Sequence, residues 1–194
     1  MSSKPTVLFL SLDEKPWFDE MYSPLINALA DRATIKRSRS SAQYLTTSPP
    51  AAVLVPDVGI ITNQDAIATL KTYVANGGTA IFGCTFSSFI TPLAMAAFWK
   101  DNFNKPWRSG NYTRENVQLD ASVAASMKSG DALADTYSQK ALFLAGVKKT
   151  EVLYGNSSEA AIVWAKYGQG WIGYIGDVNG EKGSDDVIVA MCGL

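Results

Sequence analysis

The stretch Ile67–Cys84, IATLKTYVANGGTAIFGC, decides the fold that the sequence predicts. Its first half carries apolar residues at helical spacing, namely Ile67, Leu70 and Val74. Asn63 is placed to cap this helix. Gly77 and Gly78 end it, because glycine adopts the left-handed C-terminal conformation without penalty. The apolar run Thr79–Gly83 then predicts a buried central strand.

The residues on either side of this unit extend the same pattern. A short apolar strand is expected at Ala51–Val55, and strand, helix and strand in this order predict a right-handed parallel crossover. Further strands are expected at Thr6–Leu12, Ala33–Lys36, Ala160–Lys166 and Trp171–Asp177, and further helices at Trp17–Ala30, after Thr91 and after Ser184. Residues 101–135 show no clear pattern and are predicted to be an excursion packed over the sheet. We therefore predict a single α/β domain over residues 1–194.

The composition limits what this domain does. The chain has no histidine, so histidine-dependent catalysis and histidine-ligated metal sites are excluded, and we expect no metal and no cofactor. The net charge is −1 with basic and acidic residues interspersed, which does not favour nucleic acid. No apolar run is long enough to span a membrane. Two cysteines, Cys84 and Cys192, predict no disulfide framework and favour a cytoplasmic location. A small-molecule ligand and a homo-oligomer are both compatible with this composition.

Candidate functional residues gather where predicted parallel strands end. Ligands of open parallel sheets bind at this edge, because the loops after the strands converge there. Cys84 follows the central strand and is the candidate nucleophile. Glu14 could supply a carboxylate partner. The candidate binding residues are Gly83, Thr85, Ser87, Asp177, Asn179 and Trp17.

Each of these residues also has a purely structural interpretation. Cys84 could be a small buried hydrophobe, since free cysteine is often buried. Glu14 could cap the following helix, Asp177 and Asn179 could form a turn, and Trp17 could belong to the core. If Glu14 is protonated in a dry pocket, it donates a hydrogen bond to the Cys84 sulfur and lowers the pKa of the thiol.

Two stretches, Ile67–Cys84 and Tyr167–Gly180 (YGQGWIGYIGDVNG), resemble the class I glutamine amidotransferase-like superfamily, nearest its trehalose-utilisation (ThuA-like) branch. The resemblance implies a flavodoxin-like three-layer sandwich with a mainly parallel central sheet and a closing hairpin near the C-terminus. It also implies that Cys84 stands at the position of the superfamily's nucleophile. Phe86 replaces the glycine that working members carry there, and Asp177 stands where ThuA-like proteins often carry a histidine.

These departures imply a divergent domain without glutaminase activity. A cysteine–carboxylate pair, Cys84 with Glu14, would remain for a hydrolase-type or carbonyl-directed reaction on a small molecule. A non-catalytic binding or scaffold protein on the same fold is the alternative. A phosphoacceptor receiver-like domain, with Asp57 as acceptor and Lys105 as its lysine, is a further alternative, although residues 97–104 do not read as the strand that would deliver this lysine.

Overall fold

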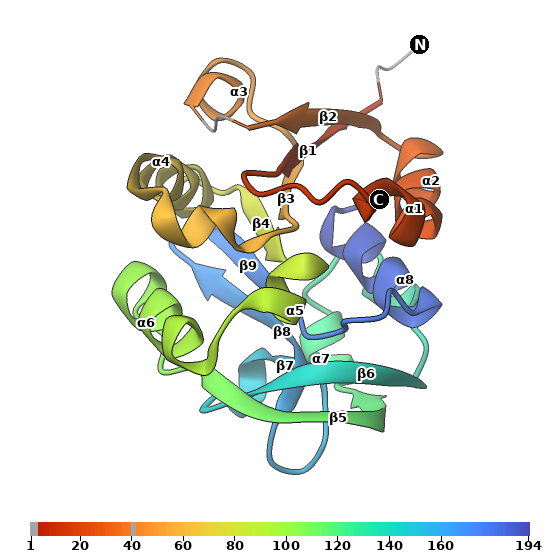
Figure 1. Cartoon of the computed structure of the whole chain (residues 1–194). Coiled ribbons are helices and arrows are strands. Elements are labelled where there is room, and N and C mark those ends of the chain that lie inside the picture. The colour runs from red at the N-terminus through yellow and green to blue at the C-terminus, as the bar shows by residue number, and fades with distance from the viewer. Residues whose placement is uncertain (1–3, 40–41) are drawn as a thin grey trace.

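The computed structural model describes residues 4–39 and 42–194, and these contain a single nine-stranded sheet (Figure 1). The strands lie in the order β2-β1-β3-β4-β9-β8-β6-β5-β7. The first five pair in parallel: β2 (Thr34–Ser38), β1 (Thr6–Leu10), β3 (Ala52–Val55), β4 (Thr79–Phe82) and β9 (Gly170–Ile175). Their carboxyl ends therefore lie along one edge of the sheet.

The other strands pair antiparallel. They are β5 (Arg108–Leu119), β6 (Thr136–Ala145), β7 (Val152–Gly155) and β8 (Ala160–Tyr167). Because β7 pairs with both β5 and β8, the four strands close on themselves, as in a small barrel. An antiparallel β8–β9 pair joins this part to the parallel strands.

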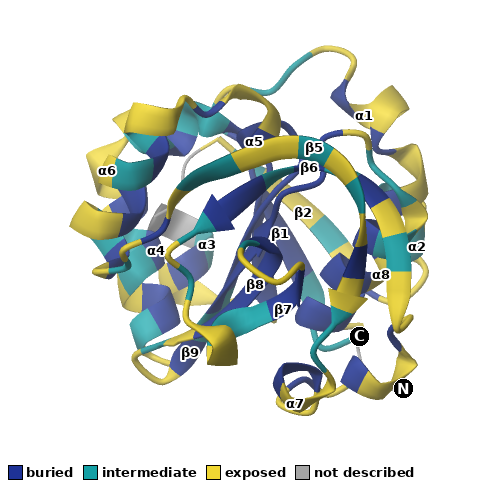
Figure 2. Ribbon diagram, turned by 90° about the horizontal axis from the view of Figure 1, so that it is seen from below, coloured by how far each residue is buried: buried dark blue, intermediate teal, exposed yellow. Residues whose placement is uncertain are grey.

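The predicted fold class, a flavodoxin-like sandwich with a mainly parallel sheet, is therefore wrong. Among the described residues, β5, β6, β7 and β8 pair antiparallel and form a closed set of strands, which a flavodoxin-like sandwich lacks. The error lies in residues 101–135, which were read as an excursion without strands. They contain the whole of β5, whose residues are mostly polar and, apart from Val117, exposed or half-buried (Figure 2). A strand with so little apolar alternation gives almost no sequence signal.

Helices cover both faces of the parallel strands (Figure 1). One side carries α1 (Phe18–Met21), α2 (Ser23–Ala30) and α8 (Lys182–Met191), and the other carries α3 (Ala42–Thr47), α4 (Gln64–Ala75) and α6 (Pro92–Phe103). Alternate residues of β1 face the two layers: Val7 and Phe9 pack with α2 and α8, whereas Leu8 and Leu10 pack with α4 and α6.

Shorter elements connect these layers. They are α5 (Thr85–Phe89), α7 (Ala121–Ala124) and the 3₁₀ turns Val58–Thr62, Gly130–Ala132 and Lys149–Glu151. Across residues 4–39 and 42–194, no helix combines the length and the apolar character that crossing a membrane requires.

The unit from Asn63 to β4 follows the sequence prediction closely. The Asn63 side chain accepts a hydrogen bond of 2.9 Å from the Ala66 N–H and so caps α4. Gly77 follows the helix with φ +108°, a conformation in which a side chain would be strained. The β8–β9 turn packs against this end of α4, since a Cβ at Gly170 would lie 2.1 Å from the Gly78 carbonyl oxygen. Only glycine at position 170 permits that approach.

An aromatic cluster fills the layer beneath α6. Phe82, at the end of β4, has ring contacts with four neighbours: Phe86, Phe98, Trp99 and Phe103. The ring centroids lie 5.1–5.7 Å apart, in tilted or edge-to-face arrangements. Phe82 is fully buried, so the end of the central strand is fixed by this packing.

We expect Phe82→Ala to lower the free energy of unfolding by about 3–5 kcal/mol, because it leaves a cavity among rigid rings. Phe89→Ala is the matched control: Phe89 is 50% exposed, and its loss should cost under about 1 kcal/mol. Urea unfolding of both variants measures these differences. A Phe82→Ala protein as stable as Phe89→Ala would contradict the packing described for β4.

Candidate functional site

Cys84 occupies the sharp turn between β4 and α5. Its backbone angles are φ 56° and ψ −128°. Among the described non-glycine residues only Cys84 and Asn104 have positive φ, and Asn104 lies in the ordinary left-handed region at the end of α6. The ψ angle of Cys84 falls outside that region, so this turn is strained for any residue with a Cβ. Strain of this kind is concentrated at functional sites, which makes Cys84 the centre of the candidate site.

Neighbouring strands hold this turn from both sides. The Thr85 hydroxyl donates to the Pro56 carbonyl after β3 at 2.6 Å, and the Ser87 hydroxyl donates to the Ile175 carbonyl of β9 at 2.5 Å. Gly83 packs against Ile175, where an added Cβ would meet the isoleucine side chain at 3.0 Å. The predicted binding residues Gly83, Thr85 and Ser87 are thus buried and fix the backbone of the turn.

The Cys84 side chain borders a small cavity. Its polar lining comes from Cys84, Tyr22, Asp177, Ser184 and Asp185. The volume is about 10 Å³, at the lower limit for a single water molecule. Cys84 is 2% exposed, so in this conformation the sulfur is closed to any larger molecule.

Burial controls the ionisation of this group of residues. It raises the pKa of the Cys84 thiol well above its ordinary value, and the charges of Asp185, Asp177 and Asp57 raise it further. The predicted lowering of the thiol pKa is therefore wrong for the closed site. Burial likewise raises the pKa of Asp177 to about 7 and that of Asp185 to about 7. The thiol is neutral near neutral pH, and both carboxyls titrate there.

Tyr22 places an unsatisfied polar atom in the same cavity. Its side chain is 3% exposed, and in the described part of the chain its hydroxyl has no hydrogen-bond partner. Burial raises the pKa of Tyr22, Cys84 adds to this rise, and the nearby Ser88 hydroxyl acts in the opposite direction.

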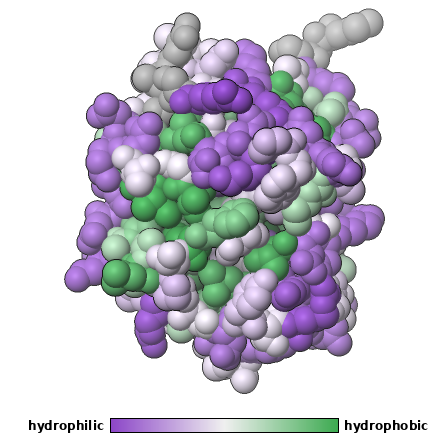
Figure 3. Space-filling model, viewed as in Figure 1, coloured by the Kyte–Doolittle hydropathy of each residue, from purple (hydrophilic) through white to green (hydrophobic). Residues whose placement is uncertain are grey.

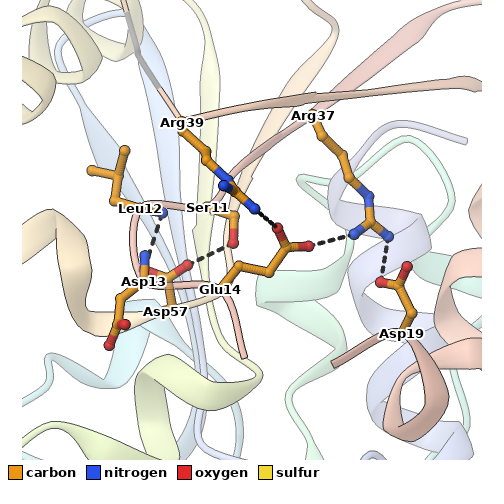
Figure 4. Close-up of polar contacts among 8 residues, drawn as sticks. All are labelled: Ser11, Leu12, Asp13, Glu14, Asp19, Arg37, Arg39 and Asp57. Atoms are coloured by element: carbon orange, nitrogen blue, oxygen red, sulfur yellow. Dashed lines mark hydrogen bonds and ion pairs between the residues drawn. The ribbon is translucent and has the colours of Figure 1, made fainter. Parts of the chain in front are cut away.

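Glu14, the predicted partner of Cys84, lies elsewhere on the rim (Figure 4). Its carboxylate accepts from Arg37 at 2.6 Å and from Arg39 at 3.3 Å. Arg37 also pairs with Asp19 at 2.6 Å. Glu14 is absent from the lining of the Cys84 cavity, where Asp177 and Asp185 supply the carboxyl groups instead.

The remaining predicted residues are placed as follows. Asp177 accepts hydrogen bonds from the backbone N–H groups of Asn179, Gly180 and Glu181, so it organises the loop before α8. Asn179 is exposed. Trp17 is 41% exposed, and its ring lies 6.4 Å from that of Phe89.

Three polar residues of the cavity, Tyr22, Ser184 and Asp185, are not among the predicted site residues. The sequence places Tyr22 within the predicted helix Trp17–Ala30, and Ser184 and Asp185 at the start of the last predicted helix. The start of α8 lies at the same sheet edge as Cys84, which is the one signal from which the position of Asp185 could have been inferred.

The residues that a phosphoacceptor receiver-like site needs, Asp57 and Lys105, are each engaged in other contacts. Asp57 is 2% exposed and accepts from the Ser11 hydroxyl at 2.7 Å and from the N–H groups of Asp13 and Gly59. Lys105 pairs with Glu151 at 2.5 Å. Asp57 is thus occupied in capping the turn after β3. Over residues 4–39 and 42–194 no cluster of three or more histidine, cysteine or acidic residues is arranged to hold a metal ion.

Comparison with known proteins identifies proteins of similar fold but no family. No family model and no curated protein matches the chain. A ThuA-like protein from Bacteroides uniformis matches in structure with a TM-score of 0.61 at 9% identity, over 98% of this chain and 91% of that one. A cytoplasmic protein from Salmonella typhimurium matches with a TM-score of 0.61 at 14% identity, over 96% and 98% of the two chains.

A larger enzyme contains the same fold. A β-galactosidase from Halorubrum lacusprofundi matches with a TM-score of 0.62 at 15% identity, over 98% of this chain and 30% of that one. This chain therefore spans about 30% of the enzyme's length. The fold is thus similar to that of ThuA-like proteins and of one part of a glycosidase, whereas no family model supports the amidotransferase-like superfamily.

The raised pKa of Asp185 predicts a dependence of stability on pH. Between the ordinary value of 3.8 and the folded value of about 7, the folded protein binds this proton more tightly than the unfolded chain. The stabilisation from the bound proton is complete below 3.8 and is lost as the pH rises through about 7. Asp185→Asn should therefore gain stability relative to the wild type as the pH rises, by about 1–3 kcal/mol between about pH 4 and pH 8.

Denaturant unfolding across that pH range measures the difference. Asp101→Asn is the control, since Asp101 is exposed and is not among the charges that shift the pKa of Asp185. Equal pH profiles for the Asp185→Asn variant and the wild type would show that Asp185 is not held protonated by burial.

Proposed function

We propose that this chain is a ThuA-like domain in which Cys84 is a nucleophile towards a small carbonyl or acyl compound, without glutaminase activity. One observation carries the proposal: a cysteine in a strained strand-to-helix turn borders a cavity together with Asp185, whose pKa is about 7. Glycine would occupy that turn at far lower cost, so a functional reason for the thiol is the simplest account of the strain.

Asp185 has the acidity that a base for this thiol needs. A general base works best when its pKa lies near the operating pH, and burial brings Asp185 to about 7. Of the charges that raise the pKa of the Cys84 thiol, that of Asp185 has the largest effect. Asp185 therefore replaces Glu14 in our proposal.

The reaction would begin with transfer of the thiol proton to the Asp185 carboxylate. The sulfur electron pair then attacks the carbonyl carbon, and the carbonyl oxygen takes up the negative charge. The backbone N–H of the residue after the nucleophile, here Thr85, is the usual donor to that oxygen at such turns. Asp185 returns its proton to the leaving group as the tetrahedral species collapses to a thioester, which water hydrolyses.

A binding role without chemistry is the second candidate, and the closed cavity favours it. A volume of about 10 Å³ admits no carbonyl compound in this conformation, and the Cys84 thiol is neutral there. The matched β-galactosidase also carries the same fold as only 30% of its chain, so the fold serves as one part of a larger protein. The two candidates differ in whether the sulfur ever reacts in the native protein.

An activated ester separates the two. Native protein treated with p-nitrophenyl acetate should form an acetyl thioester on Cys84, detected by mass spectrometry of the Cys84 peptide. We expect the acylation rate to rise with pH through the titration of Asp185, and to fall roughly tenfold or more in Asp185→Asn. Asp101→Asn, at an exposed position that does not act on the pKa of Asp185, should acylate at the wild-type rate.

Cys84→Ser checks that the adduct is on this sulfur, because the Cys84 signal must disappear in it. If native Cys84 stays unmodified while the unfolded protein is acylated, the catalytic proposal fails and the binding role is favoured.

A further inference from the structure

We propose that residues Glu14–Tyr22, called the lid below, close over Cys84 and must move away before the thiol can react. The lid comprises the end of the loop after β1, helix α1 and Tyr22. The structural argument is independent of the reaction, but the purpose of the lid, admitting a substrate, rests on the proposed function.

The lid forms part of the cavity wall. Its last residue, Tyr22, lines the cavity beside Cys84. The Tyr22 ring also reaches the opposite wall, where a Cβ on Gly180 would lie 3.5 Å from it. Movement of Tyr22 therefore widens the space next to the sulfur.

The backbone of the lid is bonded to itself and, at its end, to α2. Its N–H groups donate from Phe18 to Lys15, from Met21 to Trp17 and from Tyr22 to Phe18, whereas the Tyr22 carbonyl accepts from the Ile26 N–H and the Glu20 carbonyl from the Ser23 hydroxyl. Helix α1 is a single turn, and its start at Trp17 has no side-chain cap. Phe18 and Tyr22 are its buried residues, and a single locally bonded turn of this kind opens at lower cost than global unfolding.

Side chains provide the attachment instead. Phe18 is the buried anchor, with its ring 4.8 Å from that of Tyr22. Glu14 and Asp19 pair with Arg37, and Arg39 also pairs with Glu14, so a partly exposed ion-pair network ties the lid to β2 and the residue after it. Opening of the lid breaks this network.

An exposed aromatic contact closes the lid over the site. The Trp17 ring lies 6.4 Å from the Phe89 ring, and the Lys15 ammonium lies 5.8 Å from the centre of the same ring. Phe89 ends α5, the helix that Cys84 opens, so this contact ties the lid to the strained turn. Trp17, Met21 and Phe89 are large apolar residues that are exposed to solvent. In the view of Figure 1, the surface of the molecule carries hydrophobic residues across its middle (Figure 3).

Alkylation of the two cysteines by iodoacetamide tests the lid. Cys192 is the internal reference: it is buried near the C-terminus, does not line the cavity, and has its pKa raised to about 12 by burial. Phe89→Ala removes both the Trp17 and the Lys15 contacts and should raise the labelling rate of Cys84 roughly tenfold, with no change at Cys192. Trp17→Ala should act in the same direction with a smaller effect, since it leaves the Lys15 contact.

Leu93→Ala is the matched control, because Leu93 is 83% exposed and has no part in the contact between the lid and Phe89. It should leave the labelling of both cysteines unchanged. Thermal melts confirm that each variant is folded. The lid is refuted if Phe89→Ala leaves Cys84 labelling unchanged, or if it accelerates Cys84 and Cys192 equally, which would indicate global unfolding.

The labelling result and the acylation result are separable. Faster alkylation in Phe89→Ala together with no acetyl thioester in any variant would support the lid and refute the catalytic proposal. Acylation of Cys84, together with a Cys84 alkylation rate that is unchanged in Phe89→Ala and Trp17→Ala, would support the chemistry and refute the lid.

Discussion

The backbone turn at Cys84 is the constraint on which the site depends. β4 must end there in a conformation with φ 56°, because α5 is held to the neighbouring strands by the Thr85 and Ser87 hydroxyls. Those bonds require β3, β4 and β9 to lie in register, which the parallel pairings provide. Phe82, two residues before Cys84, anchors the same strand in the aromatic cluster. The strands β3, β4 and β9 therefore fix the turn that carries the sulfur. In our proposal, the lid covers the sulfur on the side of Tyr22.

The predictable part of the fold is the part with strong local periodicity. Asn63, the apolar stripe of α4 and Gly77 mark a helix and its ends in the sequence, and the structure confirms them together with the parallel β3–β4 pair. The antiparallel part gave no such signal. β5 reads RSGNYTRENVQL, with one buried residue, Val117, so nothing in it alternates between apolar and polar. Its pairing with β6 is set by long-range contacts that a linear pattern does not contain.

The site divides in the same way. Cys84 could be identified because it directly follows a predictable strand. Its neighbours could not, since Tyr22 and Asp185 come from helices that are distant in sequence and were read as ordinary helical positions. Glu14 was chosen because it follows β1, but Arg37 and Arg39 on β2 and just after it draw its carboxylate outward. The charge of a neighbouring strand thus decided which carboxylate meets the thiol.

Closure and chemistry are linked through hydration. In the closed state burial keeps the thiol neutral and raises the pKa of each of the two carboxyls to about 7, and each raised pKa reflects the cost of a buried charge. Admission of water or substrate reduces that cost and moves all three groups towards their ordinary values. The closed conformation is then a protected state of the thiol, and the strain at Cys84 is maintained in it.

The most direct test of this account is the stability of Cys84→Gly compared with Cys84→Ala. Both variants lose the same thiol, but only glycine adopts φ 56° and ψ −128° without strain. If the turn is strained, Cys84→Gly is more stable than Cys84→Ala by about 1 kcal/mol in urea unfolding, even though glycine also increases the entropy of the unfolded chain. A Cys84→Ala variant as stable as Cys84→Gly, or more stable, would contradict the claim that a strained turn holds the sulfur in place.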